Sequence, residues 1–212
     1  MPDTNLALFV AASLAVIVAP GPDNIYVLTR GIAQGRKVAL ASAWGMCSGL
    51  LFHTTLAAVG LSAILARSAG ALSLVKYIGA AYLVYIGIRV LLSREEVCPS
   101  VEKVFTVKLR NFFLQGLTMN LLNPKVAVFF MAFLPQFVSP SVGKAGSATL
   151  RLVALGLVFA LLSVVIFSAI ALFSGVVGDR LSRNPRFATA LQWSTAFVLV
   201  GLGVRLALSG RQ

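Results

Sequence analysis

The chain has 212 residues, of which 58% are hydrophobic and 11% are charged, and its mean hydropathy is +0.92. Soluble domains carry roughly 25% charged residues, so these values exclude an ordinary soluble domain and indicate an integral membrane protein. The formal net charge is +12, but the basic residues lie mostly in short connectors between apolar stretches. The positive-inside rule accounts for this distribution better than nucleic-acid binding does.

Six stretches are long and apolar enough to cross a bilayer, which takes about 20 mostly apolar residues. The first begins near the N-terminus, where Asp3 is the only charge and the basic segment of a signal peptide is missing, so we expect a retained helix. The predicted fold class is therefore an all-α integral membrane protein. We expect its six transmembrane helices at residues 6–29, 38–66, 72–92, 112–137, 152–177 and 187–208.

Proline motifs interrupt the first and fourth predicted helices. A bilayer tolerates a broken helix only where the freed backbone is buried in protein or lines a polar cavity. Paired breaks in two halves of a chain are typical of a transporter's binding site. We expect new half-helices to start at Asp23 and Lys125, because a proline precedes each of them. The two motifs are Pro20-Gly21-Pro22-Asp23 and Asn123-Pro124-Lys125.

The two breaks occupy corresponding places in two halves of the chain. A polar connector, residues 93–111, separates residues 1–92 from residues 112–212, and each part holds three predicted helices. The end of the third helix, from Gly87 to Ser93, is similar in pattern to the end of the sixth. Three helices are an odd number, so we expect the two repeats to be inverted relative to each other.

Lysine and arginine residues in the connectors predict the orientation. Ten of them follow the first, third and fifth helices, and four lie on the other side. The more basic side is expected to face the cytoplasm. Both termini are therefore predicted on the non-cytoplasmic side.

Two buried charges mark the candidate site. Asp23 is the only carboxylate inside a predicted helix, and Lys125 lies near the middle of its own. A charge at the bilayer centre costs roughly 2.5–3.5 kcal/mol on insertion scales. One hypothesis is a cavity for a zwitterion, whose carboxylate meets a half-helix N-terminus or Lys125 and whose ammonium meets Asp23 or freed carbonyls. The alternative is that the prolines only kink the helices and the two charges pair as a buried strut.

Other polar residues surround the breaks. His53 is a second candidate for proton coupling beside Asp23, because an imidazole titrates near neutral pH; a hydrogen-bonded packing role is the alternative. Four amides are candidates for binding or gating, although satisfying the freed backbone is the simpler role for each: Asn24, Asn120, Asn123 and Gln136.

Several functions have no support in the sequence. Cys47 and Cys98 form neither a metal-binding spacing nor a disulfide pattern, and we expect no metal and no cofactor. No nucleophile elbow and no phosphate-binding loop is present, so an enzyme is not expected. Small residues spaced by four, such as Gly45 and Gly49, favour close helix packing within one subunit, with a homodimer face as the alternative.

Together these residues resemble the lysine exporter and homoserine–threonine resistance (LysE/RhtB-type) family over nearly the whole chain. The first-half motif Pro20-Gly21-Pro22-Asp23 is followed by Gly31, Gly35, Gly45, Gly49 and His53. The third predicted helix has the family's pattern from Lys76 to Leu83, with Gly87. The second half has Phe113, Gly116, Asn120, Asn123-Pro124-Lys125, Phe129, Phe130 and Pro135-Gln136-Phe137.

The resemblance implies export of amino acids across the bacterial inner membrane by secondary transport, driven by the proton-motive force. One acid and one base at the candidate site favour a neutral amino acid over lysine or arginine. The expected partners are therefore an amino acid, protons and lipid. The alternatives are export of an amino-acid derivative or a cation, and a channel or a non-transporting scaffold.

Overall fold

The computed structural model describes residues 3–19, 21–67, 69–92, 108–138 and 145–208, and every regular element in these ranges is a helix. This confirms the predicted all-α class for the described chain. Four long helices coincide with the second, third, fifth and sixth predicted ones: α3 (Arg36–Arg67), α4 (Ala69–Leu92), α7 (Ala145–Arg183) and α8 (Pro185–Leu208). Pro20 and residues 93–107 of the predicted connector lie outside the described residues.

Each of the two interrupted helices is a bent pair. α1 (Asp3–Val18) meets α2 (Pro22–Gln34) at an angle of 53°. α5 (Leu109–Leu121) meets α6 (Pro124–Val128) and its continuation at 48°. That continuation is a π-helical turn, η1 (Phe129–Phe133), and a 3₁₀ turn, η2 (Leu134–Phe137). The predicted breaks are confirmed.

The second half-helix begins at a proline in both pairs. Pro22 and Pro124 occupy the first helical position, where the missing N–H would have had no partner within the helix. The half-helices therefore start one residue before the predicted Asp23 and Lys125. In neither pair can the preceding helix continue through the proline, because the proline ring would clash with the carbonyl four residues back.

Length and composition single out one helix of the described chain that could cross a bilayer alone, over Ala148–Val176. The number rises to three if each bent pair counts as one span. Two further apolar helices, Tyr77–Leu92 and Gln192–Leu208, are shorter. The helical segments are thus where the sequence predicts them, while the six membrane crossings and the division into inverted repeats stay predictions.

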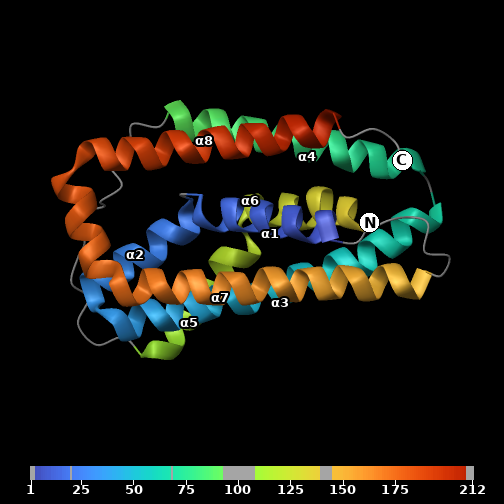
Figure 1. The fold of residues 1–212 in the computed structure, drawn as a ribbon. Helices are drawn as coiled ribbons and strands as arrows, with labels where there is room; N and C mark the ends of the chain where they lie inside the picture. The colour runs from blue at the N-terminus through green and yellow to red at the C-terminus, as the bar shows by residue number, and fades with distance from the viewer. Residues whose placement is uncertain (1–2, 20, 68, 93–107, 139–144, 209–212) are drawn as a thin grey trace.

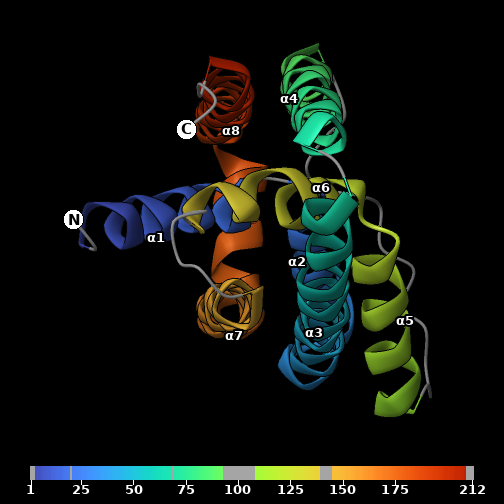
Figure 2. The same ribbon diagram turned by 90° about the vertical axis from the view of Figure 1, so that its right-hand side faces the viewer.

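The helices form three layers, which Figures 1 and 2 show from two directions. α4 and α8 lie side by side in one outer layer, and α3, α5 and α7 form the other. α1 and the segment from α6 to η2 lie between these layers. α2 runs from the middle layer down to α3 and α7. The two helix breaks are therefore in the interior of the molecule.

Corresponding helices of the two halves run in opposite directions. α3 is antiparallel to α7, and α4 is antiparallel to α8 (Figure 1). α1 begins and α8 ends at the same end of the molecule, on the right in Figure 1. The turns from α2 to α3 and from α7 to α8 lie at the opposite end.

Glycines set the close packing of α3. A side-chain carbon on Gly45 would collide with the backbone of Phe113 in α5, and one on Gly116 would collide with the backbone of Ser42. On α7, Gly156 lies against Thr54 of α3, which a side-chain carbon would approach to 2.5 Å. The small-residue stripes thus pack helices within one subunit, as predicted.

An aromatic cluster fills the core beside the breaks. Phe129 is fully buried, and its ring centroid lies 6.2 Å from that of Phe9 in α1 and 4.8 Å from that of Phe159 in α7. Phe130 packs edge-on against Phe159 at 5.2 Å. Phe129 and Phe130 belong to the π-helical turn η1, which follows soon after the second break. Such π-turns inside helices are frequent at functional sites.

Candidate functional site

The four carbonyl oxygens at the C-terminal end of α1 accept hydrogen bonds from two side chains. Nζ of Lys125 donates to Val16 O at 3.2 Å and to Ala19 O at 3.1 Å. Nδ2 of Asn24 donates to Ile17 O at 2.9 Å and to Val18 O at 3.4 Å. These donors replace the helical bonds that the break removes. The lysine of the second break therefore caps the helix that ends at the first.

Asp23 occupies the opposite side of the same break. It lies in the first turn of α2 and is 2% exposed. An anion is stabilised at a helix N-terminus and a cation at a helix C-terminus. Asp23 and Lys125 thus compensate the facing dipole ends of α2 and α1.

The two charges interact electrostatically, but no ion pair within 4.0 Å is found between these two residues. Lys125 is 4% exposed, and the bonds that hold its ammonium go to backbone carbonyls instead. The buried strut that we considered as an alternative is therefore formed between Lys125 and α1, and does not join the two side chains directly.

The absence of a side chain at Gly21 leaves space for the Lys125 ammonium. A side-chain carbon at Gly21 would lie 2.9 Å from Nζ of Lys125. The φ angle of Gly21 is −161°, an extended backbone that any residue can adopt. The glycine therefore leaves space for the approach of Lys125, while its own backbone conformation does not demand a glycine.

Two amides from the second break lie beside the Asp23 carboxylate. Asn120, 1% exposed, is in the last turn of α5, and Asn123, 2% exposed, is the N-cap of α6. Oδ1 of Asn123 accepts a hydrogen bond of 2.9 Å from the backbone N–H of Lys125. This cap satisfies one of the free donors at the start of α6. The first and second breaks thus meet at one polar junction, which we define as Asp23, His53, Asn120, Asn123 and Lys125.

His53 reaches the junction from α3. It is 3% exposed, and its Nε2 lies 3.1 Å from the carbonyl oxygen of Asn120. Its ring lies 5.8 Å from that of Phe130, so the aromatic cluster borders the junction. The packing role that we considered for His53 and its position near Asp23 are both found in the structure.

The sequence places one further candidate near the breaks, and the structure puts it elsewhere. Gln136 is exposed on η2, and its Nε2 donates to the carbonyl of Ala132 in its own segment at 2.9 Å. Pro20 lies outside the described residues. The junction thus contains five of the predicted site residues, and Gln136 lies apart from it.

A second polar group joins α2 to α5, and sequence reasoning did not identify it. The guanidinium of Arg30 lies 4.9 Å from the ring centroid of Tyr26 and 5.2 Å from that of Phe112. The hydroxyl of Tyr26 donates to Oε1 of Gln115 at 2.8 Å. The spacing of Tyr26 and Arg30 by four residues puts them on one helix face and is a signal that could have been used.

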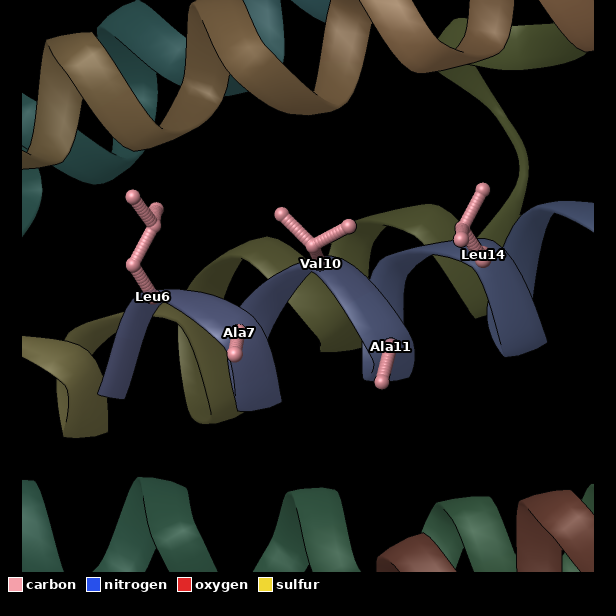
Figure 3. A pocket seen from close by; sticks show the side chains of 5 residues that line it. All are labelled: Leu6, Ala7, Val10, Ala11 and Leu14. Atoms are coloured by element: carbon pink, nitrogen blue, oxygen red, sulfur yellow. The ribbon is translucent and has the colours of Figure 1, made fainter. Parts of the chain in front are cut away.

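The hollows described in the structure lie away from the junction. An open groove of about 520 Å³ follows one face of α1, where Figure 3 shows Leu6, Val10 and Leu14 pointing to one side. Ala7 and Ala11 complete its lining. A second open hollow of about 450 Å³ lies at Arg186 and Trp193 on α8. Neither is lined by a residue of the junction.

The fold and the junction define a class: a helical protein with two broken helices whose charged ends meet in its interior. A family model described as LysE type translocator matches residues 14–210 of the chain. The chain belongs to this family. It is a family of translocators. No solved structure matches the chain.

Named proteins from several bacteria are similar to this chain. A membrane protein of Bacillus subtilis, YrhP, is 28% identical over 97% of this chain and 99% of its own length. The threonine efflux protein of Escherichia coli is 32% identical over 65% of this chain and 70% of its own length. The leucine efflux protein of an Enterobacter species is 27% identical over 96% of this chain and 95% of its own length.

Proposed function

We propose that this protein is a secondary transporter that exports neutral amino acids from the cytoplasm. The observation that carries the proposal is the polar junction, where a carboxylate, a lysine, a histidine and two amides are buried together at two helix breaks. Ionisable groups inside a membrane protein are expensive and mark transport pathways. Membership of a translocator family supports the same conclusion.

The architecture of the proposal is six membrane crossings in two inverted repeats, residues 1–92 and 112–212. The antiparallel directions of α3 against α7 and of α4 against α8 support it. Each bent pair would form one crossing, and its break would lie near the bilayer midplane, where the binding sites of inverted-repeat transporters are found.

The protein is proposed to lie in the bacterial inner membrane with both termini outside the cytoplasm. The charge asymmetry of the connectors and the common end at which α1 begins and α8 ends support this orientation. A cysteine placed at exposed Lys37, in a background without Cys47 and Cys98, tests it. A membrane-impermeant maleimide should label it only from the cytoplasmic face, and labelling from outside would contradict the orientation.

Transport by alternating access requires the junction to open. The Lys125 bonds to α1 join the second half of the chain to the first, so a relative movement of the two halves has to break them. We propose that the state in which Lys125 caps α1 is the closed one. Asp23 is the primary candidate for the proton carrier, with His53 second.

A neutral substrate is supported by the charges at the junction. Asp23 is its one carboxylate and Lys125 its one primary amine, and each is matched to a helix end. A basic substrate would need a further carboxylate. The names of the relatives, threonine and leucine efflux proteins, agree with a neutral amino acid.

The test is efflux from proteoliposomes that contain the purified protein and a mixture of the twenty amino acids. An imposed pH gradient, acidic outside, should accelerate the loss of a few neutral species. No selective loss by folded protein present in both orientations would overturn the proposal and direct the search to amino-acid derivatives and cations. Non-saturable flux without dependence on the gradient would indicate a channel instead.

A further inference from the structure

Four buried polar side-chain atoms of the junction make no hydrogen bond of good geometry, although the Asn120 and Asn123 amides lie beside the Asp23 carboxylate. They are Oδ1 of Asp23, Oδ1 of Asn120, Nδ1 of His53 and Nδ2 of Asn123. The four residues are at most 3% exposed. Buried polar groups in folded proteins are almost always hydrogen-bonded, so a cluster without partners requires an explanation.

The partner of His53 determines the role of its free nitrogen. A carbonyl oxygen can only accept, so the 3.1 Å contact with Asn120 O requires the proton to be on Nε2. In the neutral imidazole the other nitrogen, Nδ1, is then an acceptor. Three of the four unpartnered atoms are therefore acceptors, and one of them belongs to a carboxylate.

The lysine of the junction does not supply the missing donors. The Lys125 ammonium is held by the carbonyls of Val16 and Ala19 on the other side of the break. The acceptors of Asp23, Asn120 and His53 are thus matched to a cation that carries several N–H donors. A primary ammonium has three such donors and one positive charge.

We propose that Asp23, Asn120 and His53 form a subsite for the primary ammonium of the substrate. This rests on the proposed function, which it deepens by assigning the part of the substrate that is recognised. The remaining atom, Nδ2 of Asn123, is a neutral donor beside the Asp23 carboxylate. Because these groups recognise only the amine, the subsite also accepts a substrate whose carboxyl group is an uncharged derivative.

The aromatic cluster adds a wall to this subsite. Phe130 is fully buried against the His53 ring, and Phe159 packs behind it. Such a wall excludes water, which strengthens the attraction between an ammonium and the Asp23 carboxylate. The recognition of an amine is therefore favoured at this end of the junction.

A chemical series on the unaltered protein tests the subsite. The thermal unfolding of the purified protein in detergent is measured with leucine, leucinamide and N-acetyl-leucine, and with the three threonine counterparts. Compounds with a free ammonium should raise the unfolding midpoint, with apparent affinities for the amide and the parent amino acid within about threefold. The N-acetyl compounds should bind at least thirtyfold more weakly.

The subsite would be refuted if N-acetyl-leucine stabilised the protein as much as leucinamide does. It would also be refuted if none of the compounds with a free ammonium raised the unfolding midpoint. Exchange of labelled leucine or threonine in proteoliposomes tests the proposed function separately. Binding of amines without exchange would refute the transport function and keep the subsite.

A variant adds a second test in the same binding assay. Asn120→Leu keeps the size of the side chain and removes its acceptor, so the affinity for leucinamide should fall at least tenfold. Asn111→Leu changes an exposed residue of the same helix and is the matched control. An unchanged affinity in folded Asn120→Leu protein would contradict the assignment.

Discussion

The ammonium of Lys125 lies 3.1 Å from the carbonyl oxygen of Ala19, although 106 positions of the chain separate the two residues. This bond places a cation from the second helix break at the negative end of the helix that stops at the first. Two broken helices thereby stabilise one another, since neither break leaves its charged residue in an apolar environment. This bond joins the two halves of the proposed transporter at the helix breaks, in addition to the packing of α3 on α5 and α7 and of α4 on α8.

Removing the Lys125 ammonium should destabilise the fold. Lys125→Met leaves the carbonyls of Val16 and Ala19 without donors, and each orphaned acceptor costs about 1–3 kcal/mol. The free energy of unfolding in mixed micelles measures this loss. Lys37→Met, on an exposed lysine of α3, is the matched control and should leave stability unchanged. A Lys125→Met protein as stable as the parent would show that the cap contributes nothing.

Gly21→Ala should impair transport through a single added carbon. The new methyl group would lie 2.9 Å from Nζ of Lys125 and force the ammonium away from α1. We expect the rate of amino-acid exchange to fall roughly tenfold, about 1.4 kcal/mol in the rate-limiting barrier. Gly201→Ala, where nothing lies within 4 Å, should retain the parental rate. Equal rates in the two variants would refute the role of Gly21.

Gly45→Ala should destabilise the packing of α3 on α5. The added methyl group meets the backbone of Phe113, which cannot rotate away as a side chain can. Overpacking of this kind costs about 1–3 kcal/mol, and the thermal unfolding midpoint should fall. Gly175→Ala on α7 meets nothing within 4 Å and should be neutral or slightly stabilising, because alanine is the better helix former. A Gly45→Ala midpoint equal to that of the control would contradict the close contact.

Substrate binding should release a proton if Asp23 serves both the proton and the substrate ammonium. The titratable groups that act on Asp23 are Lys125 from α6 and His53 from α3, and Asp23 in turn acts on Cys47 of α3. Because the ammonium binds the ionised carboxylate, affinity should weaken as the pH falls, by up to about tenfold per pH unit once free Asp23 is protonated. Calorimetry in buffers of different ionisation enthalpy measures the released proton. If the substrate bound without releasing a proton at any pH, Asp23 would not serve both as the proton carrier and as the ligand of the ammonium.

Sequence patterns were sufficient for the positions of the helices and of both breaks. Proline lacks a backbone donor and cannot continue a helix, so Pro22 and Pro124 had to interrupt their segments. The burial of Asp23 and Lys125 followed from their place inside apolar stretches. Gly45 was predictable as a packing residue from its spacing with Gly49, because residues four apart share a helix face.

The contacts between the halves could not be predicted in the same way. The choice of Lys125 between Asp23 and the carbonyls of α1 depends on how the two breaks dock, and sequence spacing does not encode that geometry. Gln136 is an example of a residue that the sequence placed in the site and the fold places outside it. Its distance in sequence from the break suggested a place in the site, but the turn of η2 directs it outward to its own backbone.

The most direct test of the central claim is gradient-driven leucine and threonine export by the Asp23→Asn protein in proteoliposomes, compared with the parent chain. The substitution keeps the size of the side chain and removes its charge, so the protein should insert and fold. We predict that a pH gradient accelerates export by the parent and has no effect on the variant. Export by folded Asp23→Asn protein at the parental rate would show that the polar junction is not the transport site.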